Sequence, residues 1–196
     1  AVTTPAISPT TDTGRLANIA RTVGKIQFVF GGKAHPKDWA GKELIKRIVG
    51  FSEGIGHSVK IVYLENYDMK LGGLIASGVD LWLNTPLKPN EASGTSGMKA
   101  AVNGVPSLSV LDGWWIEGCI EGSTGWSIGS DSADQAPAPM DEAQELYNKL
   151  EYLILPVFYR KREEWIRIMQ HCIAINGSFF NTHRMVQQYV LNAYFI

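Results

Sequence analysis

Apolar residues in the first part of the chain follow two alternating patterns, short continuous runs and faces with helical spacing. The runs are bounded by turn residues, which predicts strands buried on both faces. They cover residues 26–30, 59–64, 79–83 and 107–111. Between them, apolar residues recur every three or four positions, which predicts short helices that each bury one face. These helical segments cover residues 16–23, 39–49, 69–76 and 98–103.

Strands that alternate with helices are typical of βαβ units, whose right-handed crossovers build a parallel sheet. The pattern therefore predicts an α/β fold with a doubly wound, mostly parallel sheet covered by helices on both faces. Beyond Gly129 only helical spacing remains, so we expect a helical C-terminal extension. In it, Asp141 is expected to cap a helix that ends at Pro156, and Asn181 to cap the last helix.

Three segments follow from these patterns. Residues 1–14 lack any periodicity and are expected to form a flexible lead-in. Residues 15–132 carry all the predicted strands and form the α/β domain. Residues 133–196 comprise a polar, proline-bearing linker and the C-terminal helices that pack on this domain.

The charge and composition of the chain limit the kinds of molecule that it is expected to bind. The 18 Lys and Arg residues balance the 19 Asp and Glu residues, so no excess of charge attracts nucleic acid or an acidic membrane. No apolar run reaches the ~18 residues that would span a bilayer. The N-terminal residues have no basic and apolar regions of a secretory signal. With only Cys119 and Cys172, a disulfide framework is not expected, and a cytoplasmic location is favoured.

The loop after the third predicted strand contains the best candidate site. It runs from Asn90 to Lys99 and contains two glycines and three hydroxyl side chains directly before a helix. Glycine allows the backbone to approach a ligand closely, and a helix N-terminus presents free N–H groups to an anion. Lys99 lies in the first helical turn, and Glu91 can accept hydrogen bonds from hydroxyl groups. A structural turn with a solvated lysine explains the same residues equally well.

Several long segments resemble the glycogen/α-glucan phosphorylase family, in the family's order and spacing. They are FVFGGKAHPKD, VYLENYDM, GVDLWLN, EASGTSGMKAAVNGVPSLSVLDGWW, GWSIG and FFNTHRMVQQYV. The likeness is greatest to the shorter bacterial and archaeal branch and covers nearly all of the chain after about residue 14. It implies a Rossmann-like domain, the C-terminal half of a glycosyltransferase B-type fold, whose active site faces an N-terminal domain.

The resemblance also implies a cofactor and a reaction. The family's lysine that forms a Schiff base with pyridoxal 5′-phosphate corresponds to Lys99. The cofactor would assist phosphate in cleaving a terminal α-1,4 bond of a glucan, which releases glucose 1-phosphate. Residues implied in binding the cofactor phosphate are Gly94, Thr95, Ser96, Gly97 and Tyr67, and those implied in binding the glucosyl unit are Glu91, Ser93 and Gly94. The long-chain branch has an arginine after the tyrosine, where this chain has Asp68.

The partners implied are an α-1,4-glucan, phosphate and the N-terminal domain of the same enzyme. The family's arginine and lysine that balance the two phosphates lie upstream of the first strand and match no residue here. We therefore expect this sequence to be a fragment without activity of its own. Because the family's last helix contacts the N-terminal domain, we also expect an exposed apolar face on residues 185–195, which would favour self-association into a homo-oligomer.

Two alternatives stay open. A nucleotide-sugar glycosyltransferase of the same fold would use the loop at Glu91–Lys99 to bind a diphosphate without a cofactor. A non-catalytic sugar- or phosphate-binding module would use the loop as a structural element. No metal site is expected, because the four histidines are scattered, and His35 is favoured as a structural loop residue. Trp114 and Trp115 are expected in the core or at a domain contact rather than stacked on sugar.

Overall fold

A computed structural model of the chain describes residues 12–54, 59–91, 93–129 and 139–194. The predicted lead-in at 1–11 and the linker at 133–138 lie outside the described residues. The lead-in prediction extends too far, because Asp12 caps a helix that begins at Thr13, with its side chain accepting from the Arg15 amide at 2.8 Å.

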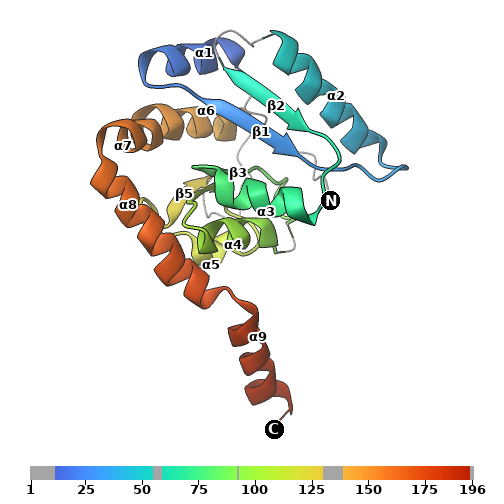
Figure 1. The fold of residues 1–196 in the computed structure, drawn as a ribbon, viewed down its shortest axis with the longest axis vertical. Helices are drawn as coiled ribbons and strands as arrows, with labels where there is room; N and C mark the ends of the chain where they lie inside the picture. Colours follow the sequence, from blue (N-terminus) through green and yellow to red (C-terminus); the bar gives the residue numbers. More distant parts are fainter. Residues whose placement is uncertain (1–11, 55–58, 92, 130–138, 195–196) are drawn as a thin grey trace.

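The described strands form two small parallel sheets (Figure 1). In the first, β1 (Gln27–Gly31) pairs with β2 (Lys60–Leu64). In the second, β4 (Ser107–Val110) lies between β3 (Trp82–Asn84) and β5 (Gly125–Ile128). The predicted α/β fold with parallel strands is therefore confirmed, although the described strands do not join into one sheet.

Helices follow the order that the sequence patterns predict. The first four are α1 (Thr13–Thr22), α2 (Trp39–Gly54), α3 (Met69–Gly78) and α4 (Thr95–Val102), followed by the single turn α5 (Trp115–Gly118). The C-terminal part comprises α6 (Pro139–Lys149), α7 (Leu155–Arg160), α8 (Arg162–His171) and α9 (Thr182–Tyr189), with π-helical turns η1 (Leu150–Ile154), η2 (Cys172–Gly177) and η3 (Val190–Tyr194). Asn181 caps α9 through a hydrogen bond from the Arg184 amide at 3.0 Å, as predicted.

Two predictions about the helical extension are wrong. α6 begins at Pro139, before the cap predicted at Asp141. The helix also continues past Pro156, which lies in the first turn of α7 rather than at a helix end. The π-helical turn η1 ends at Ile154, two residues before this proline. Its wider winding changes the hydrogen-bond ladder at the point where proline lacks an N–H group, so the helical path can continue.

The core gathers around β4, whose residues are all buried. Leu108, Trp115, Ile128 and Leu146 are essentially inaccessible to solvent. By contrast β1, which the sequence predicts as buried, is only half-buried, with Val29 41% exposed. A strand of a parallel sheet is normally covered on both faces. β1 therefore has the apolar composition of a buried strand but is half-exposed among the described residues.

The segment from α6 to α7 holds the first sheet beside the second. The Arg15 guanidinium of α1 donates to Gln144 at 2.6 Å, to Asn148 at 2.7 Å and to Glu151 at 2.9 Å. The Tyr159 hydroxyl donates to the Lys25 carbonyl at 2.6 Å, directly before β1. In Figure 1, α6 and α7 lie at the left, beside β1 and above β5.

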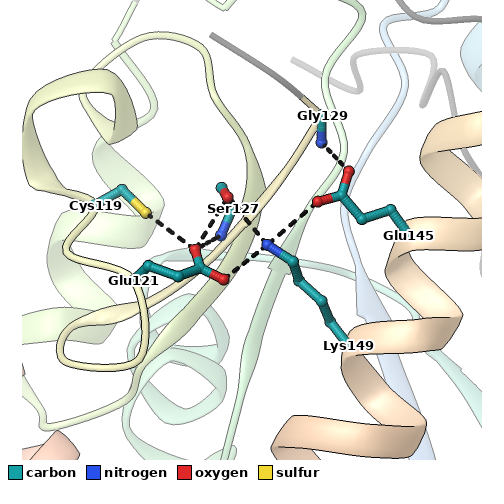
Figure 2. A network of polar contacts seen from close by, with 6 residues as sticks. All are labelled: Cys119, Glu121, Ser127, Gly129, Glu145 and Lys149. Atoms are coloured by element: carbon teal, nitrogen blue, oxygen red, sulfur yellow. Dashed lines mark hydrogen bonds and ion pairs between the residues drawn. The ribbon is translucent and has the colours of Figure 1, made fainter.

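A polar network fixes α6 against β5 (Figure 2). The Lys149 ammonium contacts Glu121 at 2.7 Å and Glu145 at 3.3 Å, and it donates to the Ser127 hydroxyl at 3.1 Å. Glu145 in turn accepts from the Gly129 amide at 2.7 Å. The side chain of Lys149 is 14% exposed, so the charge is largely shielded from water and is balanced by two carboxylates.

The last helix, α9, stands away from the rest of the fold (Figure 1). Its apolar residues are exposed, namely Met185, Val186 and Tyr189, as are Leu191 and Tyr194 of η3. The exposed apolar face predicted here is confirmed for residues 185–194; residues 195 and 196 lie outside the described part.

Candidate functional site

The loop between β3 and α4 forms an open helix N-terminus. Gly94 is the N-cap residue of α4, and its φ of 81° lies in the left-handed region that glycine adopts without strain. Among the residues that the structure describes, no side chain caps this end of the helix. The amides of Thr95 and Ser96 in the first turn therefore face away from the helix with a partial positive charge, which suits an anion.

The loop is anchored from behind by the residues that follow β4. The Asp112 carboxylate accepts hydrogen bonds from the Glu91 amide and from the Gly113 amide, both at 2.9 Å. The Trp114 amide donates to the Ser93 carbonyl at 2.8 Å. Gly113 has a φ of 56°, and a Cβ atom there would lie 2.7 Å from the Ser93 carbonyl oxygen. This close backbone contact fixes the position of the loop, and Asp112 holds the turn beside it through its two hydrogen bonds.

Trp114 supports the first turn of α4. Its indole lies against Gly97, where an added Cβ atom would approach the indole nitrogen to 2.9 Å. The Gly97 amide donates to the Gly94 carbonyl at 3.1 Å. Gly97 therefore packs on the core side of the helix instead of presenting its amide to the site. Trp114 and Trp115 are buried, which confirms their expected place in the core.

Six of the predicted site residues line one cavity of about 1280 Å³. They are Tyr67, Glu91, Ser93, Gly94, Thr95 and Ser96. Gly97 and Lys99 are not among the lining residues. Lys99 is exposed and lies one helical turn after Thr95, on the same face of α4. Helical side chains slant towards the N-terminus, so the long side chain of Lys99 can reach the turn that Thr95 occupies.

Glu91 lies beside the helix N-terminus. A Cβ atom at Gly94 would lie 3.4 Å from Glu91 Oε1, so this carboxylate oxygen is close to the Gly94 backbone. The site therefore combines hydrogen-bond acceptors at Glu91 with hydrogen-bond donors at the start of α4. Such a pairing suits a ligand that carries both hydroxyl groups and a phosphate.

Tyr67 enters the cavity from the turn between β2 and α3. Its ring packs on Gly31, and its hydroxyl lies beside Gly72, since Cβ atoms at these positions would lie 3.0 Å and 2.6 Å from the tyrosine. The neighbouring Asp68 caps α3 by accepting from the Leu71 amide at 2.7 Å. Asp68, which replaces the arginine of the long-chain branch, thus has a structural role in this chain.

Further residues line the same cavity that the sequence patterns do not single out, and three of them carry polar groups that bear on the site. They are Lys33 after β1, Asn84 at the end of β3 and Tyr63 on β2. Burial and the nearby Glu65 carboxylate both raise the pKa of Tyr63, so its hydroxyl keeps its proton and donates to the Gly32 carbonyl at 2.6 Å. Lys33 could have been found from the sequence, because it comes directly after the predicted strand and the glycines at 31 and 32.

The remaining histidine and metal predictions concern residues away from this cavity. His35 is exposed and its Nδ1 atom accepts from the Lys37 amide at 3.2 Å, which fits a structural loop residue. Within the described ranges, no three His, Cys, Asp or Glu side chains are placed to hold a metal ion. The same ranges contain no helix with the length and apolar character to cross a bilayer.

The family model and the relatives that match this chain indicate the same protein family. The family model described as carbohydrate phosphorylase matches residues 14–127. A maltodextrin phosphorylase of Thermococcus litoralis is 45% identical over 92% of this chain and 22% of its own length. Glycogen phosphorylases of Aquifex aeolicus and Mycobacterium bovis are 40% and 39% identical over 94% and 93% of this chain. The chain thus spans only 22–27% of the length of these relatives.

Proposed function

Because this chain belongs to the carbohydrate phosphorylase family, we propose that it forms the cofactor- and glucosyl-binding part of an α-1,4-glucan phosphorylase. One observation carries this proposal. The uncapped start of α4 shares a cavity with Glu91 and Tyr67, and Lys99 follows one turn later on the same helix face. One site can therefore bind a phosphate at the helix N-terminus, an aldehyde at the Lys99 amine and sugar hydroxyls at Glu91.

The residues present fit pyridoxal 5′-phosphate. Thr95 and Ser96 offer two backbone amides and two hydroxyls to a phosphate ester at the N-terminus of α4. Lys99 offers an exposed amine for the aldehyde, and among the described residues no hydrogen bond or ion pair engages it. Tyr67 lines the same cavity and can donate its hydroxyl. In the phosphorylases that this chain resembles, the bound cofactor supplies a phosphate that exchanges a proton with the substrate phosphate.

Other residues of this chain orient the glucan. Glu91 and Ser93 lie before the helix, where their oxygen atoms can bind the hydroxyls of the terminal glucosyl unit. Asp112 and Gly113 hold this part of the loop from behind, so the acceptors are positioned before a ligand arrives. Lys33, at the end of β1, adds a positive charge to the same cavity.

The proposal extends to the whole enzyme. The loop of the site is largely exposed, so a second Rossmann-like domain in a glycosyltransferase B-type arrangement would close it and exclude water. That domain, an α-1,4-glucan and phosphate are the proposed partners, and the cytoplasm is the proposed location. We expect the 196-residue chain alone to release no glucose 1-phosphate from maltodextrin.

The cofactor assignment can be tested on the chain itself. Incubation with pyridoxal 5′-phosphate, borohydride reduction and peptide mass spectrometry would identify the modified lysines. We expect Lys99 to be modified at about tenfold lower cofactor concentration than Lys46 and Lys70, a preference of about 1.4 kcal/mol. These two lysines are exposed on helices outside the site and serve as internal controls.

A matched pair of variants tests the phosphate position. Ser96→Asp places a negative charge at the start of α4, which stabilises the helix but repels phosphate. It should abolish the preference for Lys99, whereas Ser96→Ala should largely keep it. Equal modification of Lys99 and the control lysines in the unaltered chain would contradict the proposed cofactor site.

A second test uses the complete protein. Lys99→Ala should remove the release of glucose 1-phosphate from maltodextrin while leaving the protein folded. Persistent activity would show that the loop is structural. Binding of a nucleotide sugar without uptake of pyridoxal 5′-phosphate would instead favour a glycosyltransferase.

A further inference from the structure

The side chain of Trp114 lies beneath the start of the candidate site. A Cβ atom at Gly94 would lie 3.2 Å from the indole, and one at Gly97 would lie 2.9 Å from it. These two glycines are the N-cap residue of α4 and a residue of its first turn. The Trp114 amide also donates to the Ser93 carbonyl at 2.8 Å. The position of Trp114 therefore sets the position of the backbone that the proposed phosphate site uses.

The indole has little room to shift. A Cβ atom at Gly118 would lie 2.6 Å from its six-membered ring, so Gly118 and Gly97 both approach the indole more closely than a residue with a side chain could. The Trp115 ring packs against it as well, with 5.1 Å between the ring centroids. Protein interiors packed this closely resist compression and transmit strain. A change in the packing behind the indole should therefore reach Gly94 and Gly97.

Phe180, from the C-terminal part of the chain, packs behind the indole. The rings of Phe180 and Trp114 lie nearly perpendicular, with an interplanar angle of 77° and 5.0 Å between centroids. Phe180 also lies beside Gly118, where an added Cβ atom would be 3.3 Å from its Cε2 atom. α4 therefore contacts the nitrogen-bearing edge of the indole, whereas Phe180 lies towards the six-membered ring. Edge-to-face contacts of this kind are directional, so the phenyl ring restrains the orientation of the indole.

The bend that carries Phe180 is held by its own hydrogen bonds. In Figure 1 the chain turns there from the end of α8 and η2 into α9. The Phe180 amide donates to the carbonyl of the buried Asn176 at 2.8 Å. Asn181 caps α9 and also donates through its side chain to the Ser178 carbonyl at 2.6 Å. These bonds fix the direction in which the Phe180 ring projects towards Trp114.

We infer that Phe180 is a positioning residue for the candidate site, because it holds the Trp114 indole against α4 and so fixes the amides at the start of this helix. The inference rests on the proposed function in one respect, the use of these amides by a cofactor phosphate. Donors that are already in place bind a charged group better than donors that first have to be ordered. Loss of the Phe180 ring should therefore loosen the start of α4 without any ligand and also weaken a phosphate site there.

Hydrogen–deuterium exchange with mass spectrometry tests this role without a ligand. Phe180→Leu keeps an apolar side chain but removes the ring, so peptides covering residues 93–99 should exchange about threefold faster or more. Phe158→Leu is the matched control, because Phe158 makes the same edge-to-face contact with Trp165 at 5.0 Å. A general loss of stability should speed the exchange of β4 in both variants, whereas only Phe180→Leu should affect residues 93–99. An unchanged rate at residues 93–99, or an equal change there in both variants, would overturn the inference.

Borohydride trapping of pyridoxal 5′-phosphate then measures the effect on the site. The readout is the preference for Lys99 over Lys46 and Lys70 in the folded chain. Phe180→Leu should reduce this preference about threefold or more, and Phe180→Tyr, which retains the ring, should keep it. An undiminished preference in Phe180→Leu would contradict the inference, as would an equal loss in Phe180→Tyr. If the unaltered chain shows no preference for Lys99, the proposed cofactor site fails, and the exchange rates still decide whether Phe180 positions the loop.

Discussion

A single methyl group added at Gly113 should displace the loop that carries the candidate site. The residue has a φ of 56°, and its Cβ atom would lie 2.7 Å from the Ser93 carbonyl oxygen. That oxygen accepts the Trp114 amide at 2.8 Å, so the loop has to move away from a backbone partner to make room. We therefore expect Gly113→Ala to lower both the stability of the fold and the affinity of the site.

The magnitude follows from two contributions. An alanine in the left-handed region costs about 1–2 kcal/mol relative to glycine. Loss of the hydrogen bond between Trp114 and Ser93 removes a further ~0.5–1.5 kcal/mol. The free energy of unfolding should fall by about 2–3 kcal/mol, which lowers the melting temperature of a chain of this size by roughly 4–12 °C.

Two other glycines provide matched controls. Gly122 has a φ of 71° but no atom within 4 Å of its added Cβ, so Gly122→Ala measures the backbone cost alone. Gly73 lies in the middle of α3 with open space around it, so Gly73→Ala should stabilise the helix by about 0.5–1 kcal/mol. Urea unfolding followed by tryptophan fluorescence gives the three free energies, and borohydride trapping at Lys99 reports the site.

The measurements on these glycine variants can also contradict the proposed role of Gly113. If Gly113→Ala and Gly122→Ala lower the free energy of unfolding equally and leave trapping at Lys99 unchanged, the contact between Gly113 and Ser93 does not hold the loop. A larger loss for Gly113→Ala with weaker trapping is the expected result.

Two further predictions concern the packing of the C-terminal helices. Lys149→Met leaves Glu121 and Glu145 without their shared ammonium and should cost about 1–3 kcal/mol in urea unfolding, between the values for exposed and buried ion pairs. Lys161→Met removes an exposed pair with Glu164 and should cost less than about 0.5 kcal/mol, so equal losses would contradict the role of the network. Burial raises the pKa of Cys172 to about 12, so the thiol binds its proton more tightly in the folded state than in the unfolded state. The stability that this provides is complete below the unfolded pKa of ~8.5 and declines as pH rises towards 12, by at most ~1.4 kcal/mol per pH unit. Cys172→Ala should flatten this decline in unfolding experiments between pH 9 and 11, and an unchanged slope would contradict the assignment.

Local patterns in the sequence are sufficient for much of the fold. The runs at 26–30 and 59–64 predict β1 and β2, and helical spacing predicts α1, α2 and α9 close to their observed bounds. The loop from Glu91 to Ser96 is also recognisable, because glycine and hydroxyl residues before a helix have the same local geometry in many folds. The long segments shared with α-glucan phosphorylases identify the family.

Other features depend on contacts between distant residues. β5 is missed, since four residues beginning with Gly125 carry too little periodicity, and the strand forms by pairing with β4. The third strand, predicted at 79–83, lies further along the chain as β3 at Trp82–Asn84, because those residues pair with β4. The half-exposed state of β1 likewise depends on which neighbours pair with it.

The sequence by itself determined which residues form the helices, most of the strands and the loop of the site, because these depend on spacing and side-chain type within a few residues. Only the tertiary structure decided that Gly97 faces Trp114, that Asp68 caps α3, and that residues of β1 and β3 line one cavity with the loop of the site. These features arise where segments far apart along the chain meet, and the balance of packing and hydrogen bonding there cannot be read from either segment alone.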